Sequence, residues 1–348
     1  LRRFRLKAIP FAEPTLTEVK ERSRAHLSLV RDTLANGARL DRSDVLEELN
    51  APAGFRVLLG SPGTGKSALA RHWTEAGEEP IWLRPTDIRD FWRTGPARLS
   101  YALLNTGVPT RVVIDGLDRV FDEEVLKVAG AFLHQMAMSG SSVEILLTSM
   151  EDEWGRLSKA LVASRVQWDA LRVVPLTEDD LRNLLAGSPR LLDAALRCRS
   201  FGPLRNLKVL DTLVGRFSNA AGVEAATVDE ASFSRWFVED LVAGTGPSPT
   251  MRRQAATQLA IRQALTSSPE TPISELELSE AIDELIRDGI CHSDHGRIRF
   301  SHGLYGDWIR ANHLESLTTT RLAFLVDQAS APSWHRALRL YFLGMGNR

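Results

Sequence analysis

One stretch of eight residues, GSPGTGKS at positions 60–67, restricts the possible folds more than any other part of the sequence. A short apolar run at positions 55–59 precedes it, and a helical pattern begins at Lys66. The glycines therefore lie between a strand and a helix. Because glycine adopts backbone angles closed to other residues, successive N–H groups can point inward around an anion, and the helix N-terminus adds further donors. The pattern predicts a phosphate-binding loop.

The two polar residues that end the loop indicate which anion binds. The ammonium group of Lys66 can reach the β- and γ-phosphates of a nucleotide, and the hydroxyl of Ser67 can ligate Mg²⁺. We therefore expect ATP or ADP, with Mg²⁺, as the cofactors. A glycine turn that resembles the motif by chance is the alternative. The predicted phosphate-binding residues are Gly60, Ser61, Pro62, Gly63, Thr64, Gly65, Lys66, Ser67 and Ala68.

Strand-like and helical patterns alternate after the loop. Short apolar runs recur at positions 79–83, 111–114, 143–147 and 172–174, and helical spacing fills the segments between them. This alternation predicts an α/β fold with a parallel sheet covered by helices on both faces, ending near Leu176.

The second half of the chain reads as helical. Thr177 followed by acidic residues is a helix-capping signal, and several helices follow. Two helical patterns and then a turn between two strand-like runs give the order of a winged helix. We expect five parts: a helical lead-in (1–50), a P-loop NTPase domain (51–176), a helical domain (177–245), a winged-helix domain (246–316) and the start of a C-terminal helical region (317–348).

Acidic and hydroxyl residues follow two of the predicted strands. Asp115 comes directly after the apolar run at 111–114, where an uncompensated carboxylate is costly, so we expect it to hold Mg²⁺ with Ser67. Asp118 either polarises the attacking water or caps the following helix. Thr148 ends the run at 143–147 and either faces the γ-phosphate or caps the strand. Lys66, Asp115, Asp118 and Thr148 are the candidate catalytic residues.

Taken together, GSPGTGKS, VVIDGLD, ILLTS, a helical domain and a winged helix resemble the STAND NTPases, which include the NACHT and NB-ARC proteins. The resemblance covers roughly residues 51–314. It implies a slow ATPase that acts as a switch in signalling or defence, closed with ADP and oligomeric with ATP. It also implies that Pro203 packs on the adenine and that His302 contacts the β-phosphate of ADP.

Three positions depart from related families. Gly116 stands where AAA+ ATPases carry a glutamate that positions water, Met150 where many STAND proteins carry arginine, and Arg119 where an acid is common. We therefore expect slow hydrolysis, and a scaffold that binds nucleotide without hydrolysing it stays open.

A DNA-binding AAA+-like ATPase, such as an initiator or a transposition regulator, is the alternative function. Its recognition helix should present basic and amide groups to DNA. The candidate helix at positions 278–288 carries four acids and one arginine, which would repel a duplex. We therefore expect self-association and an unknown protein or ligand trigger rather than nucleic acid as partners.

Composition adds limits on the location of the chain. The 43 Lys and Arg residues balance 44 Asp and Glu residues, so the net charge is −1 and gives no general attraction to anionic partners. Two cysteines and the lack of a bilayer-length apolar run favour a cytoplasmic protein without a membrane partner. Because no initiating Met is present, we expect a processed piece or a module of a longer chain.

Overall fold

The computed structural model describes residues 12–51, 54–95, 97–106, 108–139, 143–197, 202–216, 220–244, 248–277, 279–294, 296–317, 321–328 and 331–346. The chain divides into two compact units. The sheet unit comprises Leu1–Thr33 and Arg39–Val174, and the helical unit comprises Leu34–Ala38 and Pro175–Arg348.

The sheet unit is built on five parallel strands in the order β2-β3-β4-β1-β5. The strands are β1 (Phe55–Leu59), β2 (Glu79–Leu83), β3 (Thr110–Ile114), β4 (Val143–Ser149) and β5 (Asp169–Arg172). The parallel sheet predicted from the apolar runs is confirmed. The position of the last strand was wrong: β5 begins before the predicted run at 172–174 and overlaps it only at Arg172. The order puts β4 between β1 and β3, so the carboxyl ends of these three strands are neighbours.

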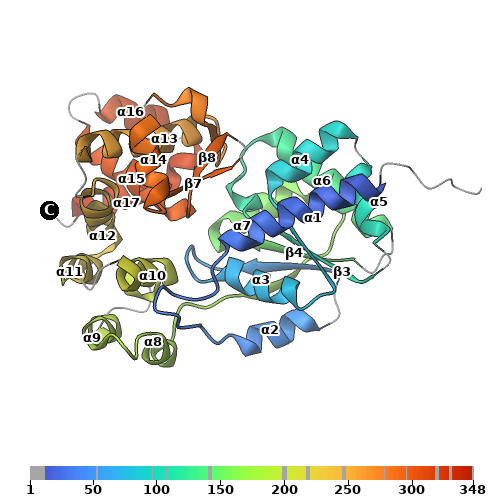
Figure 1. Ribbon diagram of the computed structural model, residues 1–348, viewed down its shortest axis with the longest axis horizontal. Coiled ribbons are helices and arrows are strands. Elements are labelled where there is room, and N and C mark those ends of the chain that lie inside the picture. Colours follow the sequence, from blue (N-terminus) through green and yellow to red (C-terminus); the bar gives the residue numbers. More distant parts are fainter. Residues whose placement is uncertain are drawn as a thin grey trace, which may run out of the picture. The chain divides into compact units, whose positions relative to one another are not determined.

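Helices cover both faces of this sheet, as Figure 1 shows. Alternating strand residues divide between two apolar cores: Val57 and Leu59 pack with α4 to α7, whereas Leu58 packs with α2 and α3. The helices of the sheet unit are α1 (Ala12–Leu29), α2 (Ser43–Asn50), α3 (Lys66–Glu75), α4 (Pro85–Thr94), α5 (Arg98–Leu104), η1 (Leu117–Arg119), α6 (Glu123–Met138), α7 (Glu151–Ala160) and η2 (Val162–Ser164).

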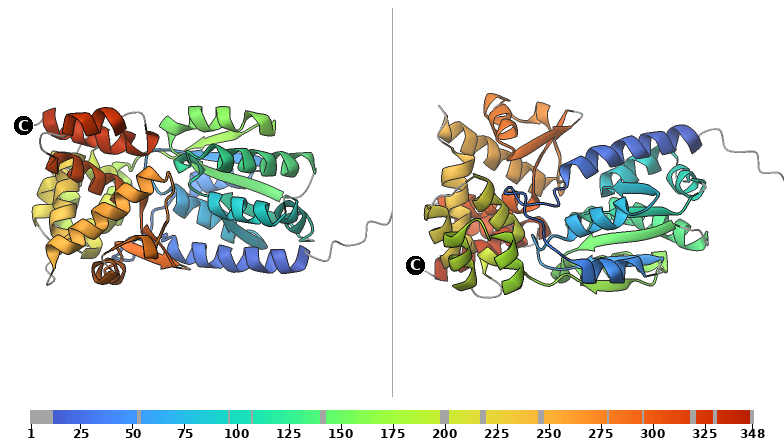
Figure 2. Two further views of the ribbon diagram at one scale, coloured as in Figure 1. Left: turned by 90° about the horizontal axis from the view of Figure 1, so that it is seen from above. Right: turned by 60° about the horizontal axis from the view of Figure 1, so that its bottom comes forward.

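The first helix closes the edge of the sheet. Helix α1, dark blue in Figure 2, packs on the edge strand β2. Its Ser23 hydroxyl accepts a hydrogen bond from the Trp82 backbone N–H at 2.7 Å and donates one to the Pro80 carbonyl at 3.3 Å. These bonds satisfy edge groups that would otherwise be free to pair with another strand.

The helical unit contains a second, antiparallel sheet. Its strands β6 (Thr271–Pro272), β7 (Cys291–Asp294) and β8 (Arg297–Phe300) lie in the order β6-β8-β7 and, with α13 (Pro249–Leu265) and α14 (Ser279–Arg287), form a winged helix. The remaining helices are α8 (Glu178–Leu184), α9 (Pro189–Arg197), η3 (Pro203–Arg205), α10 (Leu207–Arg216), α11 (Ala220–Val228), α12 (Glu230–Trp236), the π-helix η4 (Phe237–Val242), η5 (Ile273–Glu275), α15 (Gly303–Ser316), α16 (Arg321–Gln328), η6 (Pro332–Trp334) and α17 (His335–Gly346).

The capping signal at Thr177 is present as predicted, because Thr177 and Asp180 form reciprocal side-chain to backbone hydrogen bonds at the start of α8. Within the described ranges, no helix is long and apolar enough to cross a membrane.

Candidate nucleotide-binding site

The glycine-rich loop connects β1 to α3, as its sequence requires. Gly63 and Gly65 have φ angles of 76° and 93°, a left-handed region that other residues enter only at a cost. A Cβ atom on Gly60 would lie 2.8 Å from the Val173 carbonyl oxygen, so the loop starts where the backbone after β5 approaches closely. Helix α3 begins at Lys66, and Gly65 at its N-cap position makes no side-chain cap hydrogen bond. The loop thus combines a tight turn with a helix N-terminus that its own N-cap side chain does not cap, as an anion site needs.

Lys66 lies against the loop that precedes it. Its ammonium nitrogen donates hydrogen bonds to the carbonyl oxygens of Gly60 and Ser61, both at 2.8 Å. The Thr64 hydroxyl closes the same turn by donating to Ser61 at 2.9 Å. The cation is therefore held by the turn itself, within the segment expected to carry the phosphates.

Three oxygen-bearing side chains from different elements meet beside the loop. Oδ1 of Asp115 accepts hydrogen bonds from Ser67 Oγ at 3.1 Å and Thr148 Oγ1 at 2.5 Å. The backbone N–H of Gly116 donates to Thr148 Oγ1 at 3.3 Å. Carboxylate and hydroxyl oxygens are the donors that Mg²⁺ prefers, so Ser67 and Asp115 fit the ion expected from the sequence. The strand order explains the meeting, because β4 lies between β1 and β3.

Asp118 lies in η1 and is almost completely buried, with 3% of its surface exposed. Its Oδ2 atom accepts a hydrogen bond from the Met150 backbone N–H at 2.7 Å. Burial raises the pKa of Asp118, against the opposing effects of the Arg119 charge, the Met150 N–H and the Lys66 charge. Asp122, rather than Asp118, caps α6 by accepting from the Glu124 N–H. The alternative in which Asp118 caps the following helix is therefore wrong, and its role with water stays a prediction.

The sequence missed two groups that hold the segment around Asp118. One is the backbone N–H of Met150, which carries no side-chain signature. The other is Arg156 on α7, whose guanidinium bonds the Asp118 carbonyl oxygen. Arg156 lies outside every recognised motif, so only the approach of α7 to η1 in three dimensions reveals it.

The other two predicted ligand residues, Pro203 and His302, lie in the helical unit. Pro203 starts η3, and His302 caps α15 because its Nδ1 atom accepts the Leu304 N–H at 3.2 Å. With Nδ1 accepting, the proton of a neutral His302 lies on Nε2. Lys208, on the helix after Pro203, lies with its ammonium 5.3 Å from the ring centre of Tyr305, on the helix that His302 begins. The two segments are thus close within this unit, and the proposed nucleotide contacts of both residues stay predictions.

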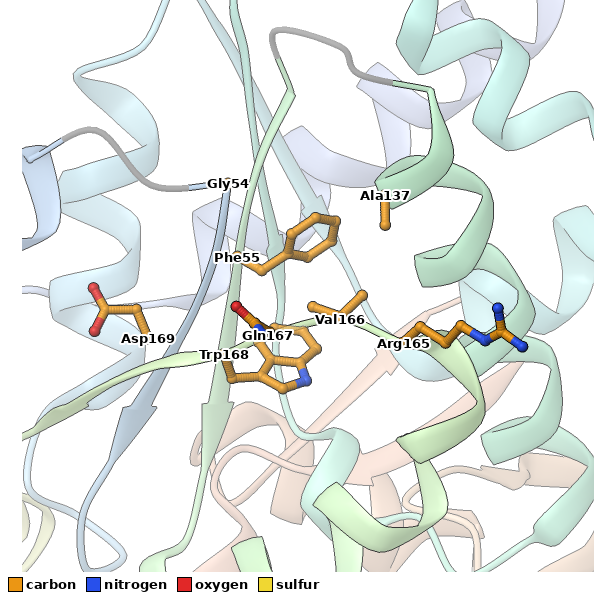
Figure 3. A pocket seen from close by; sticks show the side chains of 8 residues that line it. All are labelled: Gly54, Phe55, Ala137, Arg165, Val166, Gln167, Trp168 and Asp169. Carbon is orange, nitrogen blue, oxygen red and sulfur yellow. The ribbon is translucent and has the colours of Figure 1, made fainter.

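A separate cavity of about 480 Å³ lies at the other end of β1, and Figure 3 shows its lining. Phe55, at the start of β1, and Trp168 meet edge to face with ring centres 5.7 Å apart. Val166 adds to this apolar lining, while Arg165 and Asp169 extend to opposite sides in Figure 3. Because the phosphate loop follows the carboxyl end of β1, the cavity and the nucleotide site are distinct.

Comparisons with known proteins give a likeness of fold. No protein-family model matches the sequence, and no curated protein matches it. Among similar solved structures is the Orc1 protein of Aeropyrum pernix in complex with DNA, with 16% identity, a TM-score of 0.39, and 82% of this chain and 95% of that chain covered. A Walker-type ATPase of Pyrococcus abyssi shows 14% identity, a TM-score of 0.43, and coverage of 81% and 99%.

A third similar structure is a STAND protein with a tetratricopeptide repeat sensor from Pyrococcus horikoshii. It shows 13% identity, a TM-score of 0.36, and coverage of 88% of this chain and 48% of that chain. Nothing in these likenesses supports the expectation that nucleic acid is not a partner, and it stays a prediction. The sheet unit has the P-loop NTPase fold: a glycine-rich phosphate loop joins a parallel strand to a helix, with an acid directly after a nearby strand.

Proposed function

We propose that this chain binds ATP or ADP with Mg²⁺ at residues 60–68 and hydrolyses ATP slowly. The observation that carries the proposal is the meeting of Ser67, Asp115 and Thr148 beside a loop whose ammonium group comes from Lys66. In the proposed reaction, Lys66 and the loop amides bind the phosphates, and Ser67 and Asp115 hold Mg²⁺, which neutralises charge on the phosphates. Asp118 orients the attacking water, and Thr148 keeps Asp115 in place.

Calorimetry with ATP and ADP on the Lys66→Ala variant tests this proposal. We expect affinity to fall at least about 100-fold, because charge-assisted bonds to phosphate are lost. Lys127→Ala is the matched control, since Lys127 is an exposed lysine of α6 that pairs with Glu123. Micromolar affinity retained in Lys66→Ala, or equal losses in both variants, would contradict the assignment of the loop.

The finer proposal is a STAND-type switch, closed with ADP and oligomeric with ATP, in signalling or defence. His302 supports it through its position at the start of α15, where its Nδ1 atom caps the helix. The resemblance to STAND proteins implies that it contacts the β-phosphate of ADP, and a histidine N–H can donate to a phosphate oxygen. Converting such a switch from nearly all closed to nearly all open requires a ligand that discriminates the two forms by about 5.5 kcal/mol, so a second signal besides ATP is expected.

Light scattering in the presence of ATP tests the switch. We expect His302→Ala to increase the oligomeric fraction relative to the exposed control His335→Ala, because the closed form loses a bond to ADP. An unchanged oligomeric fraction would remove His302 from the switch. ADP that co-purifies with the unaltered chain would support the closed resting form.

The alternative, a DNA-binding AAA+-like ATPase, is disfavoured by the charges on α14. Glu284 of α14 pairs with Arg252 at 3.3 Å, and Asp288, directly after the helix, pairs with the same arginine at 2.5 Å. The other two acids, Glu280 and Asp283, are exposed. A helix with this charge would be repelled by phosphates. Fluorescence anisotropy with duplex DNA at low salt distinguishes the two, and nanomolar binding would favour the alternative.

A further inference from the structure

The loop that carries both acids of the candidate site contacts Ser67 and Leu83, and the segment that follows β4 adds several further contacts. The acid loop, residues 115–120, follows β3, and the segment from Thr148 to Arg156 runs from the end of β4 into α7. Thr148 contacts Asp115 and Gly116, as described above, and the Met150 N–H bonds the Asp118 carboxylate. These contacts fix the side chains of the two acids.

Arg156 holds the backbone of the same loop. Its Nη2 atom donates to the Asp118 carbonyl oxygen at 2.6 Å, and Nη1 donates to the Val120 carbonyl oxygen at 3.2 Å. The third nitrogen, Nε, donates to Glu153 Oε2 at 2.9 Å, which fixes the guanidinium from within α7. The guanidinium carbon also lies 4.4 Å from the ring centre of Phe121. Every nitrogen of the fork is therefore engaged, and two of the three bonds go to the acid loop.

The geometry matters because Asp118 is an unfavourable group to bury. Burial raises its pKa and so disfavours the charged form that a water-activating acid needs. Among the described residues, its carboxylate receives a backbone hydrogen bond from Met150. The position of the carboxylate also depends on the backbone that carries it, and Arg156 holds that backbone at the Asp118 carbonyl oxygen.

We propose that Arg156 is a positioning residue, which keeps Asp118 in place for the ATP hydrolysis proposed above. The inference rests on that proposed function for its catalytic part. Arginine suits the task because its planar fork reaches two carbonyl oxygens and stacks on an aromatic ring at once, whereas lysine is a single point charge.

The test compares Arg156→Gln and Arg156→Lys with the control Arg165→Gln. Arg165 is an exposed arginine that follows η2 and lines the separate cavity, and it makes no side-chain bond to a described residue. The first measurement is hydrogen–deuterium exchange on nucleotide-free protein. We expect faster exchange of the amides at 116–121 in Arg156→Gln, an intermediate change in Arg156→Lys, and no change in the control. Exchange in β1 should be the same in all variants.

The second measurement separates turnover from binding. We expect Arg156→Gln to lower kcat about 10- to 100-fold, since small misplacements of a reacting group have effects of that order. The Kd for ATP should stay within about twofold, because no phosphate ligand is altered. Arg156→Lys should restore part of the turnover.

Unchanged exchange at 116–121 in Arg156→Gln would overturn the proposed hold on the loop. Faster exchange with unchanged kcat, or a fall in turnover matched by an equal rise in Kd, would overturn the positioning role. Absence of hydrolysis in the unaltered chain would instead overturn the proposed function, together with the catalytic part of this inference. The exchange experiment would still decide whether Arg156 holds the loop, so the two failures are distinguishable.

Discussion

Two aspartates of the sheet unit, Asp87 and Asp118, are equally buried, each 3% exposed, but their surroundings differ. Asp87 lies in the first turn of α4, with His26 Nε2 at 2.9 Å, Arg84 Nε at 3.7 Å and Arg22 Nη1 at 3.5 Å. It also accepts the Arg84 backbone N–H at 2.7 Å. Asp118 has one backbone donor, and the charges of Arg119 and Lys66 act on it without a hydrogen bond to its carboxylate among the described contacts.

The two environments shift the pKa values of these carboxyls in opposite directions. For Asp87, burial alone would raise the pKa, but the hydrogen bond and charge of His26 and the charge of Arg84 outweigh it, so the pKa is lowered. For Asp118, burial dominates and the pKa is raised. Removing one partner of a buried ion pair is costly, so Asp87 with its Arg84 and Arg22 partners is a structural acid, whereas a buried acid with few partners is a candidate for a functional site. The opposite pKa shifts therefore distinguish Asp87, which lies where α1 packs on the sheet edge, from Asp118, which lies in the candidate catalytic site.

The largest expected effect comes from Asp118→Asn. The amide keeps an acceptor for the Met150 N–H but cannot take a proton from water, so we expect ATP hydrolysis to fall about 10²- to 10⁴-fold. Nucleotide affinity should change little. Phosphate release and calorimetry measure the two quantities.

Asp122→Asn is the matched control for that variant. Asp122 is exposed and caps α6, a role that asparagine fills equally well. Hydrolysis by Asp118→Asn at the rate of the control would mean that the shortage of partners at Asp118 is not a mark of catalysis, and the comparison with Asp87 would lose its functional meaning.

The next effect concerns stability and uses Asp87→Asn. Asparagine keeps the cap on the Arg84 N–H but removes the charge, which leaves His26, Arg84 and Arg22 around a neutral group. We expect the free energy of unfolding to fall by about 3–5 kcal/mol, as for other broken buried ion pairs. Chemical denaturation measures this loss, and hydrolysis per folded molecule should be unchanged.

Asp90→Asn provides the control, because Asp90 pairs with the same Arg22 at 3.7 Å but is about half exposed. Its cost should lie below about 1 kcal/mol. If both substitutions lowered the free energy of unfolding equally, the burial of Asp87 beside its charged partners would add nothing to stability.

The sequence alone singles out one of these two aspartates, Asp118, but gives no sign of the other, Asp87. Asp118 could be named as a candidate because it lies in a motif that follows a recognisable strand, and Asp115, Ser67 and Lys66 could be named for the same reason. Asp87 and its partner His26 lie 61 positions apart and meet only when α1 packs on β2. The role of Arg156 likewise depends on α7 folding back over η1. Contacts between distant segments leave no periodic or motif signal in one sequence.

The strands were predictable to the extent that they are buried. The runs that form β1 to β4 have near-continuous apolar burial, as parallel central strands do. The edge strand β5 consists of Asp169–Arg172, which are mostly exposed and mixed in character. The apolar residues Val173 and Val174 follow this strand. Because the prediction relied on apolar residues, it placed the strand at 172–174, too late in the sequence. The Val173 N–H continues the pairing by donating to the Leu59 carbonyl oxygen at 2.7 Å.

The smallest expected effect is the pH dependence of stability, and it tests the comparison most directly. A raised pKa in the folded state means that ionised Asp118 opposes folding at pH values above that pKa. Asp118→Asn should therefore be more stable than the unaltered chain at pH 7. The gain should shrink as the pH falls through the folded pKa of Asp118 and vanish below the ordinary value of 3.8.

Asp87 should behave in the opposite sense. Its lowered pKa contributes stability that is fully present above the ordinary value of 3.8 and is lost as the pH falls through the lower folded value. The penalty of Asp87→Asn should accordingly be constant near neutrality and decline only in strong acid. Denaturation curves for the three proteins between pH 3 and pH 8 decide the matter, because the two differences must have opposite signs at neutral pH. If Asp118→Asn were the less stable protein at pH 7, Asp118 would be a partnered structural acid like Asp87, and the reason for placing the catalytic edge at η1 would fail.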